Sequence, residues 1–193
     1  ILLREYPNYQ AKIGIQLNVT CPNTEHDNPE IKEILKMLDM CEPLVNKGIA
    51  IILKINVEMP LKNILIFGEH RNCHGISTSN TVNFGNLPEK IDWGKLFPNG
   101  SPLLKRNLNI RKPGGLSGAP LLHLVVEQIK ELRKAGFQKH INGGGGILHK
   151  DDVDKIILAG ADSISIGSVA FLNPFAIRGI IKRSHKLTSN MNG

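Results

Sequence analysis

Short apolar runs alternate with helical patterns along most of this chain of 193 residues. The runs are typical of parallel strands buried on both faces, and the segments between them repeat apolar residues at intervals of three and four, as helices do. Regular alternation of five such units indicates parallel α/β structure with right-handed crossovers. The predicted strands cover residues 13–19, 49–56 and 75–79, the run that enters 141–147, and residues 163–167.

The predicted helices begin and end at residues with capping chemistry. Asn28, Pro29 and Glu30 suit a helix start, and Gly48 ends the helix that carries Cys41 on its apolar face. Cys41 is therefore interpreted as a packing residue. Further helices are predicted over Leu61–Glu69, from Pro120 to Gly136, over 151–159, and from Pro174 to about Lys186.

The last predicted helix turns Phe175, Ile177, Ile180 and Ile181 inward, with basic residues outside. This pattern favours a helix that covers a sheet over one that lies on a membrane surface. No apolar run in the sequence reaches membrane-spanning length.

The stretch INGGGGI, residues 141–147, combines a strand with four consecutive glycines and a following helix. Glycine lets the backbone turn sharply and bring N–H groups up to an anion, and the helix start can add its dipole. A second unit follows, in which the strand of residues 163–166 ends in Gly167-Ser168. Two successive strand–glycine–helix units are typical of the last two strands of a (β/α)8 barrel, where a phosphate group is usually held.

Five units are fewer than such a barrel needs, because eight require about 250 residues. We therefore expect a single domain, residues 1–193, that comprises the C-terminal five or so βα units of a (β/α)8 TIM barrel, with roughly the first three units absent. The start at Ile1 resembles neither a signal peptide nor an initiator methionine, so the sequence is interpreted as beginning inside a longer protein. The long connection 82–118 is expected to be functional, as a lid or ligand-covering arm.

Composition excludes several classes of protein. The net charge of +7 comes from scattered basic residues without interleaved aromatic residues, which argues against nucleic-acid binding. Three cysteines without paired or metal-type spacing favour a reducing compartment, and a cytoplasmic location is expected. No metal site is expected, including at His70, Cys73 and His74.

Polar residues recur where the predicted strands end. In a barrel these strand ends share one face, the face that carries the active site. Convergence of these residues on one rim therefore predicts a site for a small molecule there. They are Asn18, Cys21, Asn23, Lys54, Asn80 and Thr81, together with the glycines of the last two units.

Six segments carry a resemblance to a known family. The chain resembles the dihydroorotate dehydrogenases, FMN-containing (β/α)8 barrels of pyrimidine synthesis, over nearly its whole length. The segments are LNVTCPN (17–23), ILKIN (52–56), SNTV (79–82), GGLSGAPL (114–121), NGGGGI (142–147) and SIGSVAF (165–171).

The resemblance implies FMN-dependent oxidation of dihydroorotate to orotate. Cys21 matches the catalytic base that removes the proton from substrate C5 while hydride passes from C6 to flavin N5. Asn18, Asn23, Asn80 and Thr81 match substrate-binding residues. Lys54 matches the lysine near flavin N1. The remaining cofactor-binding positions implied for phosphate and ribityl contacts are Ser117, Gly118, Gly145, Gly146, Gly167 and Ser168.

The cysteine at position 21 resembles the soluble class 1 enzymes, although a divergent branch of the family and the flavin domain of dihydropyrimidine dehydrogenase look similar over these segments. Residues 24–30 and 83–111 depart from the best-known class patterns, so the electron acceptor stays open, as does a homodimer. Other readings are an oxidoreductase acting on another dihydropyrimidine or enoate, a phosphate-binding barrel isomerase or lyase without flavin, and an inactive fragment.

Overall fold

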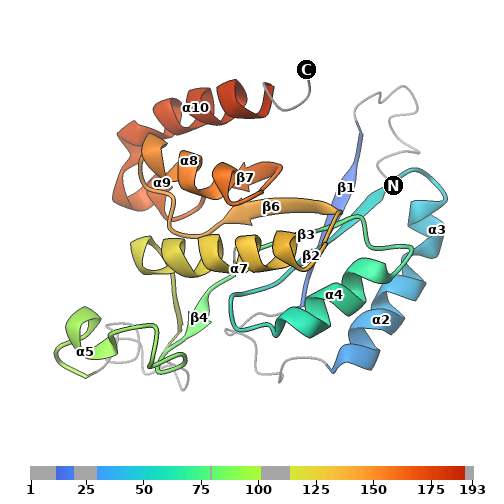
Figure 1. Ribbon diagram of the computed structural model, residues 1–193, viewed down its shortest axis with the longest axis horizontal. Helices are drawn as coiled ribbons and strands as arrows, with labels where there is room; N and C mark the ends of the chain where they lie inside the picture. The colour runs from blue at the N-terminus through green and yellow to red at the C-terminus, as the bar shows by residue number, and fades with distance from the viewer. Residues whose placement is uncertain (1–11, 20–29, 79, 101–113, 190–193) are drawn as a thin grey trace.

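The computed structural model describes residues 12–19, 30–78, 80–100 and 114–189. Its centre is a sheet whose neighbouring strands are all parallel and stand in chain order (Figure 1). The predicted parallel α/β class is confirmed, and the strands predicted over 13–19, 49–56, 75–79 and 163–167 are each shorter than expected. The strands of the sheet are β1 (Gly14–Asn18), β2 (Ala50–Lys54), β3 (Gly75–Ser77), β6 (His140–Gly144) and β7 (Ser163–Ser165).

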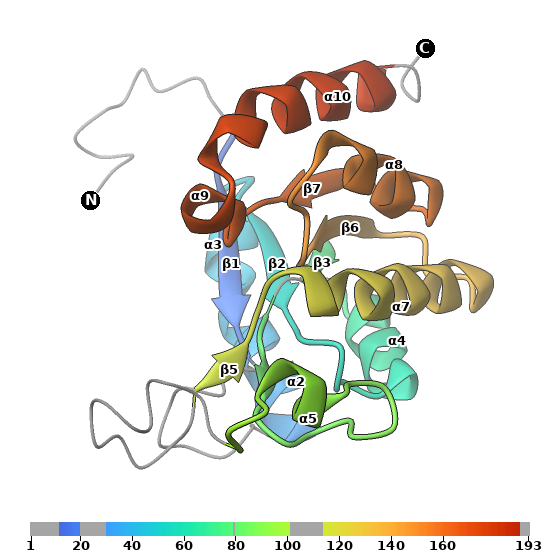
Figure 2. The ribbon, with the colours of Figure 1, turned by 90° about the vertical axis from the view of Figure 1, so that its left-hand side faces the viewer.

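The main helices follow the sheet in the same order, and each contacts the next along the row. Figure 2 shows the strands toward one side of the molecule, with α4, α7 and α8 on the other. This is the arrangement expected of successive right-handed βαβ units. The helices of the row are α2 (Ile31–Met40), α4 (Leu61–Glu69), α7 (Leu122–Lys134), α8 (Lys150–Leu158) and α10 (Ile177–Ser189).

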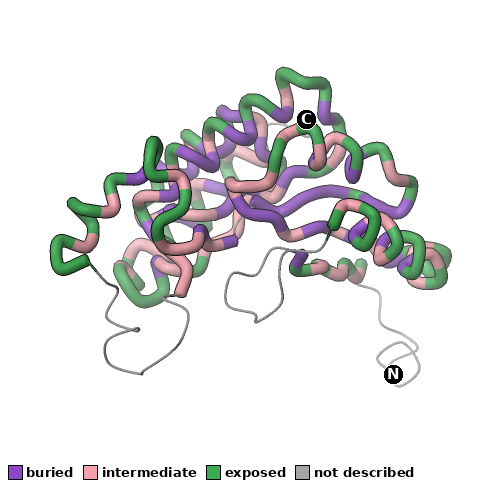
Figure 3. Tube along the Cα trace, turned by 90° about the horizontal axis from the view of Figure 1, so that it is seen from below, coloured by how far each residue is buried: buried purple, intermediate pink, exposed green. Residues whose placement is uncertain are grey.

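Burial alternates along β1 and β2 because only one face of the sheet is covered by helices there. In β2, Ile51 and Leu53 are completely buried, whereas Ile52 and Lys54 on the opposite face are half-buried. We call the face of Lys54 the inner face of the sheet. Figure 3 shows the buried residues concentrated in the strands and on the sides of the helices that meet them. The apolar core therefore lies between the sheet and its row of helices.

The helix predicted before Gly48 is interrupted. The chain leaves α2 at Cys41 and forms the separate helix α3 (Glu42–Val45). Pro43 explains the break, because proline has no N–H to donate and its ring clashes with the preceding turn. Cys41 is buried in the core, as predicted.

The connection after residue 82 contains structure that the sequence pattern did not predict. Val82–Asn83 (β4) pairs antiparallel with Gly115–Leu116 (β5), and the short helix α5 (Trp93–Leu96) lies in the segment that leads away from β4. Phe84, Trp93 and Phe97 form a cluster of rings with centroids 4.9 to 6.0 Å apart. In Figures 1 and 2 these elements extend from the sheet as an arm.

Two inward positions predicted for the last helix are wrong. Ile180 is completely buried, but Phe175 is 96% exposed and Ile181 is 44% exposed. Phe175 lies in a 3-10 turn, Pro174–Ala176, which follows the short helix α9 (Val169–Leu172) and precedes α10. Phe175 therefore does not share the helical periodicity on which its placement was based. No helix in the described part of the chain is both long and apolar enough to cross a membrane.

Gly143 of β6 gives a test of how closely helices pack on the covered face. A Cβ at this position would lie 2.4 Å from Ile156 Cγ2 and 3.0 Å from Ala161 Cβ. We expect Gly143→Ala to lower the free energy of unfolding in urea by about 1–3 kcal/mol, as overpacking does. Gly179→Ala is the control, because nothing lies within 4 Å of its Cβ position in α10. Equal stability of the two variants would contradict the close packing inferred for β6.

Candidate functional site

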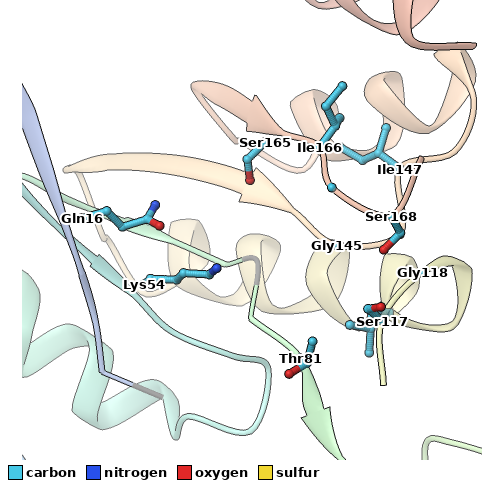
Figure 4. A pocket seen from close by; sticks show the side chains of 13 residues that line it. Gln16, Lys54, Thr81, Ser117, Gly118, Gly145, Ile147, Ser165, Ile166 and Ser168 are labelled. Carbon is cyan, nitrogen blue, oxygen red and sulfur yellow. The ribbon is translucent and has the colours of Figure 1, made fainter. Parts of the chain in front are cut away.

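A pocket with a volume of about 220 Å³ lies where the loops that follow the strands come together. Its wall is assembled from segments far apart in sequence, starting in β1 and ending just after β7 (Figure 4). Eight of the predicted site residues line it: Lys54, Thr81, Ser117, Gly118, Gly145, Gly146, Gly167 and Ser168. The other lining residues are Gln16, Leu121, Ile147, Ser165 and Ile166.

One side of the pocket is a glycine loop pressed against the start of the α7 segment. Gly145 and Gly146 follow β6 with φ angles of +105° and +82°, which side chains rarely allow. A Cβ on Gly146 would lie 2.7 Å from the Leu122 nitrogen and 2.9 Å from the Gly118 oxygen. Only glycine lets the two backbones approach this closely, so the loop has the form of a cradle for an anionic group.

The start of α8 contributes less to this cradle than the sequence suggested. The N–H groups of Leu148 and His149 donate to Asp152 Oδ2 at 3.1 and 3.0 Å. Burial alone would raise the pKa of Asp152, but hydrogen bonds from Lys155 and from these two N–H groups hold the pKa below its usual value. Because Asp152 engages these two donors, they are already used within the protein, and the helix start has fewer N–H groups to offer a ligand in the pocket.

The second predicted glycine unit lies on the same pocket. Gly167 and Ser168 follow β7 and lead into α9. Figure 4 shows Ser168 grouped with Gly118, Ser117 and Gly145 at one side. We call this group of residues, together with Gly146 and Gly167, the phosphate cradle.

Lys54 occupies the opposite side of the pocket, at the end of β2 (Figure 4). It is in register with Asn18 of β1 and with Ser77 of β3. Among the described residues that line the pocket, Lys54 is the only one with a charged side chain. The pocket thus combines one positive charge with a set of neutral polar groups.

Two of the predicted substrate residues meet beside the pocket without lining it. Asn80 Nδ2 donates to Asn18 Oδ1 at 2.8 Å, although the two lie in segments 62 positions apart. Asn80 Oδ1 accepts from the Thr81 N–H at 3.1 Å, which connects the pair to the pocket wall. Cys21 and Asn23 lie outside the described residues.

Gln16 and Ser165 line the pocket but were not predicted from the sequence. Side chains alternate between the two faces of a strand, so Gln16 shares the inner face with Asn18 two residues later. That alternation was the available signal for Gln16. Gln16 falls in no glycine motif, and Ser165 begins the segment SIGSVAF without being one of the positions singled out in it. Glutamine and serine are common at exposed positions, so their residue types gave no separate indication.

Two hydroxyl groups of the pocket lining are buried and have no hydrogen-bond partner among the described residues: Thr81 Oγ1 and Ser165 Oγ. Buried polar groups are normally satisfied, so such hydroxyls are suited to a polar ligand. Burial raises the pKa of the Cys73 thiol, but Cys73 belongs to the apolar core and not to the pocket. No group of three or more His, Cys, Asp or Glu residues suited to a metal ion occurs within the described ranges.

The sequence of this chain is similar to those of known proteins. A family model described as dihydroorotate dehydrogenase matches residues 5–188. The chain is 29% identical over 175 residues to the catalytic subunit of dihydroorotate dehydrogenase B (NAD(+)) of Oceanobacillus iheyensis, covering 87% of this chain and 52% of the relative. It is 26% identical over 172 residues to dihydroorotate dehydrogenase A (fumarate) of Lactobacillus helveticus, covering 88% and 52%.

The fold is also similar to that of solved structures. The ligand-free form of DHODH from Eimeria tenella superposes with a TM-score of 0.68 at 18% identity, covering 92% of this chain and 51% of that one. The chain therefore spans about half the length of the curated relatives and of the solved structure that it matches.

Gly146 allows a test of the phosphate cradle. We expect Gly146→Ala to lower the affinity for FMN at least about tenfold, because the new methyl group would separate the two backbones that form the cradle. Gly48→Ala is a matched control: its φ of +77° imposes similar backbone strain, but nothing lies within 4 Å of its Cβ position. Fluorescence titration measures the affinity, and equal losses in the two variants would attribute the effect to strain alone.

Proposed function

The chain belongs to the dihydroorotate dehydrogenase family, and from that premise we propose that it carries part of the site for FMN-dependent oxidation of dihydroorotate to orotate. The observation that supports this function best is that one pocket joins the phosphate cradle to Lys54. A cradle alone would suit any phosphate ester. A lysine at the far side of the same pocket suits a ligand with a phosphate at one end and an electron-accepting ring at the other.

The residues present fit FMN. Gly118, Gly145, Gly146, Gly167 and Ser168 would hold its phosphate through backbone N–H and hydroxyl groups. Lys54 would lie near N1 of the ring, and the buried hydroxyl of Thr81 would gain a hydrogen-bond partner. FMN, when bound, supplies an acceptor at N5 for the hydride that leaves C6 of dihydroorotate.

Substrate binding is proposed for the asparagine pair. The Asn18 oxygen already accepts from Asn80, so its NH2 group is the part suited to a carbonyl or carboxylate oxygen of the substrate. Thr81 is joined to Asn80 through its N–H and would position the same ring from the pocket wall. Asn23 is included in this set on the resemblance to the family.

Cys21 is proposed as the base, also on the resemblance. Its thiolate would take the proton from C5 as the C6 hydride leaves, so that the C5–C6 single bond becomes the double bond of orotate. A free thiol has a pKa of about 8.5, so a site that lowers this pKa would increase the fraction of thiolate near neutral pH. Cys21 follows β1, the strand that carries Asn18, which agrees with action on a substrate held there.

The five units described are proposed to form part of a (β/α)8 barrel. Their inner face carries Gln16 and Lys54, which are exposed and half-buried respectively, whereas Ile51, Leu53 and Ile76 on the opposite face are completely buried. Further βα units would cover this face and supply the rest of the site. We therefore propose the oxidation for the protein that contains this chain, and not for these five units alone.

An anaerobic titration tests the proposal. We expect the protein that contains this chain to be yellow and its flavin absorbance to bleach on addition of dihydroorotate. A yellow protein that dihydroorotate does not bleach would reject the substrate. A colourless protein that binds no added FMN would reject the cofactor and favour a barrel that binds another phosphate ester.

Cys21→Ala extends this titration to the mechanism. The variant should keep its flavin but reduce it about 10²–10⁴-fold more slowly, as expected for loss of a general base. Cys41→Ala is the matched control, because it makes the same chemical change in the apolar core. Stopped-flow absorbance gives both rates, and an unchanged rate in Cys21→Ala would remove this residue from the mechanism.

A further inference from the structure

We infer that Gln16 and Ser165 form, with Lys54, the subsite for the electron-accepting ring, and that the neutral side chain of Gln16 adds no negative charge beside Lys54. The inference rests on the proposed function. It assigns roles to two residues that were not among the predicted site residues.

The sheet brings Gln16 and Lys54 together. Asn18 and Lys54 are in register on adjacent parallel strands, and Gln16 lies two residues before Asn18 on the same face. Both side chains line the pocket, and Figure 4 shows them entering it from the same side. The carboxamide of Gln16 therefore reaches the part of the pocket that holds the ammonium group of Lys54.

Ser165 reaches the same space from the other edge of the sheet. It pairs with Gly144 of β6, which has no side chain to stand between Ser165 and the pocket. In Figure 4 its hydroxyl points into the pocket between Lys54 and the phosphate cradle. Ser165 Oγ is buried and has no hydrogen-bond partner in the part of the chain that the structure describes, so a ring carbonyl or nitrogen would satisfy it.

Ser163 provides a contrast on the same strand and the same face. Its hydroxyl is already 2.8 Å from His140 Nε2, and it does not line the pocket. Two serines two residues apart thus differ in whether a partner is supplied by the protein. The one without a partner is the one that lines the pocket.

The charge of the subsite explains why a neutral residue at position 16 matters. Lys54 is the one charged side chain among the described residues that line the pocket, and it brings a positive charge to this part of the lining. A reduced flavin carries negative charge near N1, and a positive charge there stabilises it. A carboxylate on the adjacent strand would offset that stabilisation, while changing the size of the side chain very little.

Gln16→Glu tests the charge. We expect affinity for reduced FMN to fall at least about tenfold relative to oxidised FMN, which lowers the midpoint potential of the bound flavin by about 30 mV for a two-electron couple. Gln138→Glu is the control, because Gln138 is exposed and lies before β6, at the opposite end of that strand from the cradle. Potentials are measured by reduction against a reference dye.

Substitution to alanine separates hydrogen bonding from charge. Ser165→Ala should weaken binding of oxidised FMN about three- to tenfold, the loss typical of a hydrogen bond, while Ser163→Ala should not. Gln16→Ala should weaken FMN binding by a similar factor without adding a negative charge. Gln16 is exposed within the described chain and lies outside its apolar core, and circular dichroism checks that both of its variants keep the fold.

The outcomes separate this inference from the proposed function. A wild-type protein that binds no FMN would overturn both. A wild-type protein that binds FMN, with the potential of Gln16→Glu equal to that of Gln138→Glu, would overturn the role of Gln16 alone. Equal FMN affinities for Ser165→Ala and Ser163→Ala would overturn the role of Ser165.

Discussion

The pocket depends on the contact between two backbones, that of the glycine loop after β6 and that of the segment leading into α7. Gly146 lies against the Leu122 nitrogen and the Gly118 oxygen at distances that leave no room for a methyl group. This contact holds the cradle at the carboxyl ends of the strands. Gly143, three residues earlier in the same run, allows Ile156 of α8 and Ile129 of α7 to pack directly on β6. The first glycine of the run, Gly143, therefore allows close packing in the core, and the last, Gly146, shapes the pocket.

The two faces of the sheet have different roles: one packs against the helices, and the other carries residues that line the pocket. Ile51, Leu53 and Ile76 face the helices and are completely buried, which supplies most of the driving force for folding on that side. Gln16, Lys54 and Asn142 alternate with residues of this kind and face the other way. A pocket can form there because the packing of the core does not need these positions.

Elements with strong periodicity were predictable from the sequence, and so were the residues of the glycine motifs. The break at Pro43 and the exposure of Phe175 were missed, because apolar spacing continues through both positions while the backbone does not. The β4–β5 pair was missed because strands of two residues carry no periodic signal. The bond between Asn18 and Asn80, and the pocket positions of Gln16 and Ser165, depend on which strands are neighbours, and no local pattern contains that information.

β1 and β7 are the outer strands of the sheet, and both contribute to the pocket, β1 through Gln16 and β7 through Ser165. A ligand that spans the pocket is therefore held by both margins of the sheet at once. If β1 and β7 moved apart, the ligand would lose its contacts with one of them. Ligand binding and the curvature of the sheet are thus thermodynamically linked, so that occupancy of the pocket would oppose flattening of these five strands.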